Sequence, residues 1–185
     1  MSILGSPKKK GNTAKVLESF EELIEKNHVN DRINLVDCDI RGCLGCGTCQ
    51  EKPDEIGCVQ KDDMSKVLER IADSDVVIYA TPLYCWSFSS QMKALIDRHV
   101  CLASGHGTPE HKSLVKGKRT ALLVTCAGPI ENNADLIQQI FDRFNDYLQG
   151  EVIGKYIVPF CTTPDSISSE ATQTAKRMHE DIFGR

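Results

Sequence analysis

Five short apolar segments alternate along the chain with longer segments whose apolar residues recur at helical spacing. The short segments cover residues 3–4, 32–36, 76–80, 120–124 and 152–158, and the helical ones begin near residues 13, 62, 90, 133 and 168. Strands that alternate with helices form a parallel sheet, because each right-handed crossover places its helix on one sheet face. The sequence therefore predicts an α/β fold with a doubly wound sheet of about five strands, in a single domain over residues 1–185.

Ligands of such sheets bind beyond the carboxyl ends of the strands, so the loops after Leu4, Val36, Ala80 and Val124 are the candidate binding loops. The first of these loops, residues 5–13, leaves a strand and opens a helix. Free N–H groups and the positive end of the helix dipole therefore point at one spot, as a phosphate group requires.

The composition of this first loop suits a phosphate, because it combines glycine, lysine and short side-chain donors. The candidate contacts are Ser6, Lys8, Gly11, Asn12 and Thr13. The alternative is a plain solvated turn in which Asn12 or Thr13 caps the helix. The loop has neither the Gly-Lys-Ser/Thr ending of a Walker loop nor a Gly-x-Gly-x-x-Gly fingerprint, which argues against ATP and NAD-type Rossmann binding.

The loop after Ala80 is rich in aromatic residues and begins with Thr81 and Pro82. Its aromatic rings can stack on a planar cofactor and its amides can bond a heteroaromatic edge, while Ser89 or Ser90 can cap the next helix. The alternative is that Tyr84, Trp86 and Phe88 only seal the end of the sheet. The candidate cofactor contacts here are Pro82, Leu83, Tyr84, Cys85, Trp86 and Ser87.

A cysteine-rich loop, residues 38–61, follows the second predicted strand and contains three equally spaced cysteines with glycines between them. Such a run resembles the cluster-binding run of ferredoxins, and a further cysteine can complete four ligands. The candidate metal ligands are Cys43, Cys46, Cys49 and Cys58. Zinc, a redox-sensing thiol pair and an empty loop are the alternatives. The other cysteines are expected to be buried small apolar residues: Cys38, Cys85, Cys101, Cys126 and Cys161.

Charge and hydropathy exclude several classes of partner. The formal net charge is −4, which gives no attraction to nucleic acid or to an anionic membrane. No apolar run approaches the roughly 20 residues that span a bilayer, and nothing at the N-terminus reads as a secretion signal. A cytoplasmic protein without nucleic-acid or membrane partners is expected.

Two motifs in this order, G-S-P-x-K-x-G-N-T and T-P-L-Y-x-x-S-x-S-x-Q-M-K-A-L-I-D-R, resemble the NADPH-dependent FMN reductase group of the flavodoxin-like superfamily. The resemblance implies a flavodoxin-like sheet of order 2-1-3-4-5 that binds FMN, with the phosphate on the first loop and the ring against residues 82–87. A third flavin loop falls at Thr125, Cys126, Ala127 and Gly128.

The cysteine run, followed by Cys-Val-x-Lys-Asp-Asp-Met, looks like the iron-sulfur flavoproteins, a branch of the same group. This likeness implies that the four candidate cysteines hold a [4Fe-4S] cluster. An insertion in this family covers the flavin or contacts another subunit, so the long loop at residues 103–117 is expected to do either. Histidines 99, 106 and 111 fit no recurring ligand pattern and are expected to be solvated or packed.

The resulting hypothesis is an FMN-dependent oxidoreductase that transfers electrons between NAD(P)H or ferredoxin and an acceptor, as a homodimer or homotetramer. A flavin carries the electron chemistry itself, so no catalytic side chain is assigned. The alternatives are a cluster-free NAD(P)H:FMN or quinone reductase and a non-enzymatic flavin electron carrier.

Overall fold

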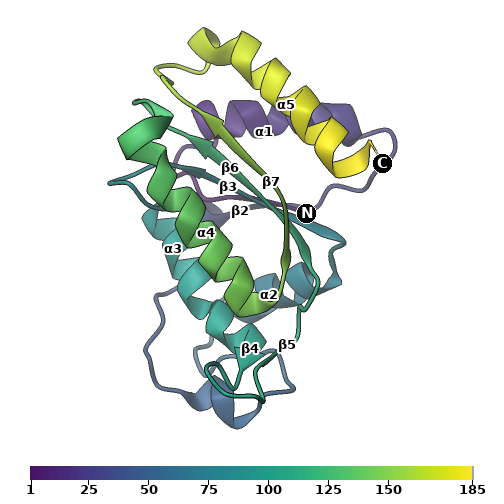
Figure 1. Cartoon of the computed structure of the whole chain (residues 1–185), viewed down its shortest axis with the longest axis vertical. Helices are drawn as coiled ribbons and strands as arrows, with labels where there is room; N and C mark the ends of the chain where they lie inside the picture. Colours follow the sequence, from purple (N-terminus) through teal and green to yellow (C-terminus); the bar gives the residue numbers. More distant parts are fainter. Residues whose placement is uncertain (185) are drawn as a thin grey trace.

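The computed structural model describes residues 1–184 and contains one five-stranded parallel sheet (Figure 1). The strand order is β2-β1-β3-β6-β7, which confirms the predicted order 2-1-3-4-5 once the two strands of a small hairpin are left out of the count. The strands are β1 (Ser2–Leu4), β2 (Arg32–Asn34), β3 (Val76–Pro82), β6 (Arg119–Thr125) and β7 (Glu151–Val158).

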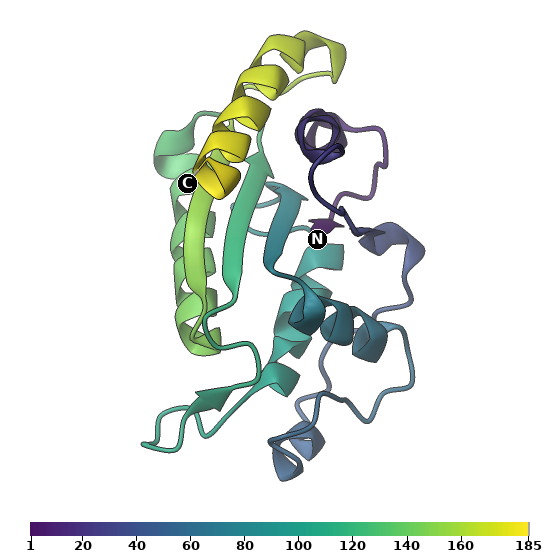
Figure 2. The same ribbon diagram turned by 90° about the vertical axis from the view of Figure 1, so that its right-hand side faces the viewer.

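Helices cover both faces of this sheet (Figures 1 and 2). Helices α1 (Asn12–Ile24) and α5 (Ser168–Phe183) lie side by side on one face, while α2 (Met64–Asp73), α3 (Ser90–Asp97) and α4 (Asp135–Leu148) lie on the other. Successive strand residues alternate between the two cores, as Tyr79 packs with α4 and Ile78 packs with α1. The central strand β3 is buried along its whole length, as its uninterrupted apolar sequence predicts.

Short helical turns complete the chain at Leu35–Asp37, Thr48–Glu51, Arg98–Leu102, Ile130–Ala134 and Asp165–Ile167. Two of these turns end a strand earlier, or start a helix later, than the sequence predicts. The second strand ends at Asn34 because the chain turns at Leu35, two residues earlier than expected. The fourth long helix begins at Asp135 because Asn132 has a left-handed φ of 55° inside the preceding turn.

The long loop at residues 103–117 contains a small antiparallel hairpin, β4 (Ala103–Ser104) and β5 (Lys112–Ser113). Gly105 and Gly107 have φ values of 66° and 80°, which let the chain reverse between these strands. His111 Nε2 lies 3.0 Å from the Tyr147 carbonyl oxygen, so the hairpin packs against the end of α4. In both views it lies beside the cysteine-rich loop (Figures 1 and 2), away from the carboxyl ends of the strands, and its role as a flavin cover or a subunit contact stays a prediction.

His99 and Tyr79 form a buried polar pair under α4, with His99 Nε2 3.0 Å from the tyrosine hydroxyl. Burial lowers the pKa of His99 to about 4, so this ring is neutral at physiological pH. Its Nδ1–H donates to the Leu95 carbonyl, and Nε2 then accepts from Tyr79. His99 is therefore packed in the core, as the sequence predicts.

Among residues 1–184, no helix combines the length and the apolar character that a membrane crossing demands.

Candidate functional site

A pocket of about 180 Å³ lies where the carboxyl ends of β1, β3 and β6 meet, and it is called the sheet-edge pocket here. The loops after these strands line it, as the sequence predicts for three of its four candidate loops. The lining residues are Ser6, Lys8, Gly11, Asn12, Thr13, Pro82, Leu83, Tyr84, Thr125, Cys126, Ala127 and Cys161. Eleven of these twelve are predicted site residues, and Cys161 is the exception.

The first loop leaves the amino end of α1 without a side-chain cap. Gly11 occupies the N-cap position and makes no side-chain cap hydrogen bond, so Asn12 and Thr13 do not cap the helix as the plain-turn alternative requires. The Asn12 Oδ1 atom is buried and has no partner in the described part of the chain. An uncapped helix start and an unpartnered buried polar atom both favour a ligand with phosphate and hydroxyl groups.

Hydrogen bonds join the first loop of the sheet-edge pocket to the loop after β6. The hydroxyls of Thr13 and Thr125 lie 2.7 Å apart, and both side chains are buried. The Leu83 N–H donates to the Thr125 carbonyl at 2.9 Å, which ties the loop after β3 to the same residue. The floor of the pocket is therefore fixed before any ligand binds.

The aromatic loop after β3 forms a tight turn in which Tyr84 and Ser87 exchange two backbone hydrogen bonds of 3.0 Å. Cys85 and Trp86 have positive φ values of 47° and 62°, as the primed turn of such a hairpin requires. The turn points out of the protein, and the Trp86 side chain is 57% exposed. Tyr84 and Trp86 therefore do not seal the sheet, whereas Phe88 is buried and does.

Four predicted contact residues lie next to the sheet-edge pocket and not in its wall, namely Cys85, Trp86, Ser87 and Gly128. Cys85 is exposed, which corrects its expected burial. Ser89 caps α3 as expected, because its hydroxyl accepts from the Met92 N–H at 3.2 Å.

Cys161 is a pocket residue that the sequence analysis did not predict. It follows β7, which runs parallel to β6, and strands of a parallel sheet end at the same edge, so its place after a strand is the signal that could have found it. Its N–H donates to the Cys126 carbonyl at 2.9 Å, so two cysteines meet in one wall. Burial raises the pKa of Cys126 and raises that of Cys161 to about 11, so both remain neutral thiols near pH 7. Neither is suited to be a thiolate nucleophile.

The four cysteines predicted as metal ligands line a second hollow of about 170 Å³, called the cysteine pocket here. Its other lining residues are Leu44, Gly45, Gly47, Gln50, Gln60, Arg98, Val100 and Cys101. Gly45 and Gly47 have φ values of 64° and 75°, which only glycine adopts readily, and these let the loop curl around the thiols. The Gln50 amide holds the loop in place by donating to the carbonyls of Val100 and Ala103.

Each of the four thiols has a hydrogen-bond donor beside it. The Gly45 N–H lies 3.4 Å from Cys43 Sγ, the Thr48 hydroxyl 3.5 Å from Cys46 Sγ, and the Gln50 amide 3.6 Å from Cys49 Sγ. The Thr48 hydroxyl lowers the pKa of Cys46. Burial raises the pKa of Cys58, but the Gln60 backbone N–H and the nearby Arg98 guanidinium outweigh it and lower the value overall. These donors stabilise sulfur in its thiolate form.

The thiols surround the cysteine pocket without converging on one point. Within residues 1–184, no three His, Cys, Asp or Glu side chains are grouped closely enough to hold a single metal ion. A tetrahedral zinc site needs four ligands at one centre, whereas a cluster takes each thiolate on a different iron. Thiols spread around one cavity therefore fit a cluster better than a lone ion.

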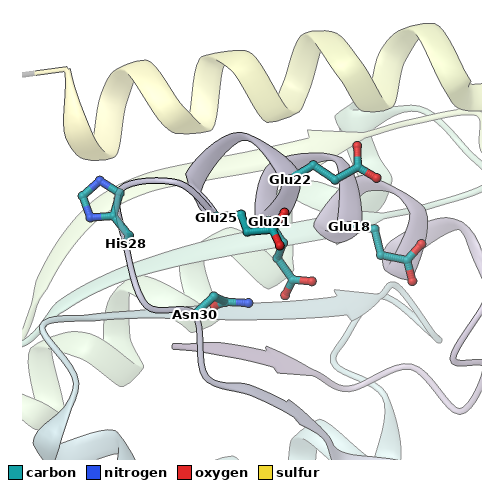
Figure 3. Close-up of a pocket in the computed structure, with 6 residues that line it drawn as sticks. All are labelled: Glu18, Glu21, Glu22, Glu25, His28 and Asn30. Carbon is teal, nitrogen blue, oxygen red and sulfur yellow. The ribbon is translucent and has the colours of Figure 1, made fainter.

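A third hollow, of about 390 Å³, lies on the outer side of α1 (Figure 3). It is lined by Glu18, Glu21, Glu22, Glu25, His28 and Asn30. Figure 3 shows the four carboxyl groups spread along the helix and the His28 ring apart from them. Arg32 already pairs with Glu21 at 2.9 Å and with Glu18 at 3.6 Å, so this groove is a solvated acidic face.

Comparison with known proteins gives the family. Residues 1–165 match the family described as NADPH-dependent FMN reductase. An iron-sulfur flavoprotein of Archaeoglobus fulgidus is 32% identical over 98% of this chain and 77% of its own length. An iron-sulfur flavoprotein of Methanosarcina thermophila is 34% identical over 54% of this chain and 51% of its own length.

Solved structures share the fold. The NAD(P)H:quinone oxidoreductase of Methanothermobacter marburgensis superposes with a TM-score of 0.71 at 16% identity, over 96% of this chain and 94% of that one. An FMN-dependent NADH-azoreductase of Bacillus anthracis, solved with FMN, gives 0.69 at 17% identity over 96% and 95%. The chain belongs to the NADPH-dependent FMN reductase family, in its iron-sulfur flavoprotein branch, and is a flavin-dependent oxidoreductase.

Proposed function

We propose that FMN binds in the sheet-edge pocket with its phosphate on the first loop. The observation that carries this proposal is the uncapped start of α1, where Gly11 leaves the N–H groups of the first turn free beside Ser6 and Lys8. Lys8 is the lysine that lines this pocket, whereas Lys9 pairs with Asp37 at 2.7 Å. Asn12 and Thr13 supply further polar atoms to the phosphate and the ribityl chain.

The flavin ring is proposed to lie between the loop after β3 and the loop after β6. Pro82, Leu83 and Tyr84 offer one wall, and Thr125, Cys126 and Ala127 the other. The exposed Trp86 lies in the turn next to Tyr84, where it can cover part of the ring from solvent. Bound FMN would supply the hydride and electron chemistry, while these residues position it and set its surroundings.

The second part of the proposal assigns a [4Fe-4S] cluster to Cys43, Cys46, Cys49 and Cys58. Four thiols around one cavity, each with a donor beside it, suit the four thiolate ligands of such a cluster. The names of the relatives in Archaeoglobus and Methanosarcina support the same assignment. When bound, the cluster would transfer single electrons, and the flavin would convert between one-electron and two-electron steps.

The proposed activity is electron transfer between NAD(P)H or ferredoxin and an acceptor, carried out by a homodimer or homotetramer in the cytoplasm. The family description supports a nicotinamide donor, whereas ferredoxin and the assembly rest on the resemblance alone. A cluster-free reductase of FMN or quinones stays the second candidate, because the fold neighbours include a quinone oxidoreductase. A carrier without its own reductase activity is the third.

The rate of flavin reduction separates the two reductase candidates from the carrier. We expect NADPH or NADH alone to bleach the flavin absorbance of the anaerobically purified protein within seconds, since the family reduces FMN with NADPH. The measurement is stopped-flow absorbance, with reduced ferredoxin as the second donor. Reduction by ferredoxin only, with no response to either nicotinamide, would contradict a nicotinamide-dependent reductase and favour the carrier.

A further inference from the structure

Arg98, where α3 passes into the Arg98–Leu102 turn, is fully buried in the wall of the cysteine pocket. Its Nη1 atom pairs with Asp62 Oδ2 and donates to the Arg41 carbonyl at 3.3 Å. Its other two nitrogens, Nε and Nη2, are buried and have no hydrogen-bond partner in the described part of the chain. A buried guanidinium with unmet donors is uncommon, and it indicates an acceptor that belongs beside it.

The partner carboxylate cannot satisfy these donors. Asp62 Oδ2 also accepts from the Arg41 N–H at 3.1 Å, and Asp62 Oδ1 accepts from the Met64 N–H at 3.2 Å. The carboxylate is therefore held by the backbone and engages only one nitrogen of Arg98. Arginine and carboxylate frequently pair through two parallel hydrogen bonds, and this pair makes only one of them, which leaves Arg98 with donors to spare.

The cysteine pocket lies beside the guanidinium. Arg98 lines it together with Cys58 and Cys101, and the guanidinium charge acts on the Cys58 thiol. Arg98 is the one cationic residue among those that line this pocket, so an anionic occupant would find its positive partner there. A cluster held by four thiolates is anionic, and its sulfurs accept N–H hydrogen bonds.

We propose that Arg98 donates hydrogen bonds through Nε and Nη2 to the sulfurs of the cysteine pocket, and that Asp62 is the positioning residue that orients it. This inference rests on the proposed cluster. Donors and positive charge stabilise the more negative, reduced form of a cluster, so Arg98 raises its reduction potential. The buried Arg98–Asp62 ion pair at the end of α3 would therefore serve to tune the reduction potential of the cluster.

The test uses Arg98→Lys in the full chain, purified without oxygen. Lysine keeps the charge and can pair with Asp62, but it has no planar fork to reach both a carboxylate and a sulfur. At a fixed potential we expect the ratio of reduced to oxidised cluster to fall at least tenfold, which for one electron is a shift of about 59 mV. The readout is a redox titration followed by electron paramagnetic resonance.

Asp62→Asn is the second variant: its amide oxygen can still accept from Arg98 and hold it in place, so the loss of negative charge is expected to shift the ratio the opposite way. Lys93→Gln is the matched control, since within residues 1–184 this exposed lysine on α3 pairs with Asp97 alone, and its loss should leave the ratio unchanged. General loosening of the loop would move both variants in one direction. Shifts of opposite sign therefore support the inference.

Two further outcomes separate this inference from the proposed function. Wild-type protein without iron and sulfide overturns the cluster and this inference together, whereas a wild-type cluster with the same potential in both variants overturns the inference alone. If Arg98→Lys does not fold, wild-type protein labelled with ¹⁵N-arginine replaces it. Hyperfine coupling of arginine nitrogen to the reduced cluster is then expected, and its absence contradicts the inference.

Discussion

Thr13 shows how one side chain connects two loops of the sheet-edge pocket. It is buried at the start of α1, and its hydroxyl meets that of Thr125 at 2.7 Å. The sequence places both residues in the candidate site because each follows a parallel strand, and strand ends meet at one edge. Their hydrogen bond could not be read from the sequence, since it joins residues 112 positions apart.

Thr13→Val is expected to weaken FMN binding by about tenfold. Valine keeps the shape but removes the hydroxyl that is proposed to contact the FMN phosphate; an unmade hydrogen bond of this kind costs about 1–3 kcal/mol, and 1.4 kcal/mol corresponds to about tenfold in affinity. Fluorescence titration of the flavin-free protein with FMN measures the affinity. Thr172→Val is the control, because that exposed threonine on α5 donates its hydroxyl to the Ser168 carbonyl, far from the candidate site. Equal affinities in the two variants would contradict the role given to Thr13.

At the scale of elements, periodicity predicted the core helices and strands because their buried faces repeat along the sequence. An element boundary differs from its predicted place where a single residue decides it. Asn132, with a φ of 55°, delays α4, and the two-residue strands β4 and β5 are too short to leave a periodic pattern. The position of the cysteine pocket could not be predicted, because it depends on contacts between residues far apart in the sequence, such as those from Gln50 to Val100 and Ala103.

The packing of α3 on the end of β1 gives a prediction at this scale. A Cβ atom at Gly5 would lie 2.8 Å from the Met92 Cβ, so the helix must shift to admit it. We expect Gly5→Ala to lower the free energy of unfolding by about 1–3 kcal/mol, as overpacking does. Urea denaturation measures the change. Gly57→Ala is the control, since nothing lies within 4 Å there, and an equal loss in both variants would contradict this close packing.

On the scale of the whole molecule, the two pockets lie at opposite ends of α3. Ser89, which caps the start of the helix, donates to the Gly5 carbonyl beside the first loop, and Arg98 at its end lines the cysteine pocket. A helix of eight residues is about 12 Å long. The sequence order placed the cysteine loop at the sheet edge after the second strand, but the chain carries it to the other end of the fold (Figure 2).

The amounts of FMN, iron and sulfide in the purified protein test most directly the central claim, that the chain binds both FMN and an iron-sulfur cluster. After anaerobic purification, we expect about one FMN, four iron and four sulfide per chain, with the visible spectrum of both groups. Cys46→Ser should lose the iron and sulfide yet keep FMN, whereas Cys38→Ser, outside the pocket, should keep all three. Zinc in place of iron, or FMN with no metal in the wild-type protein, would contradict the cluster. A chain without FMN would contradict the account as a whole.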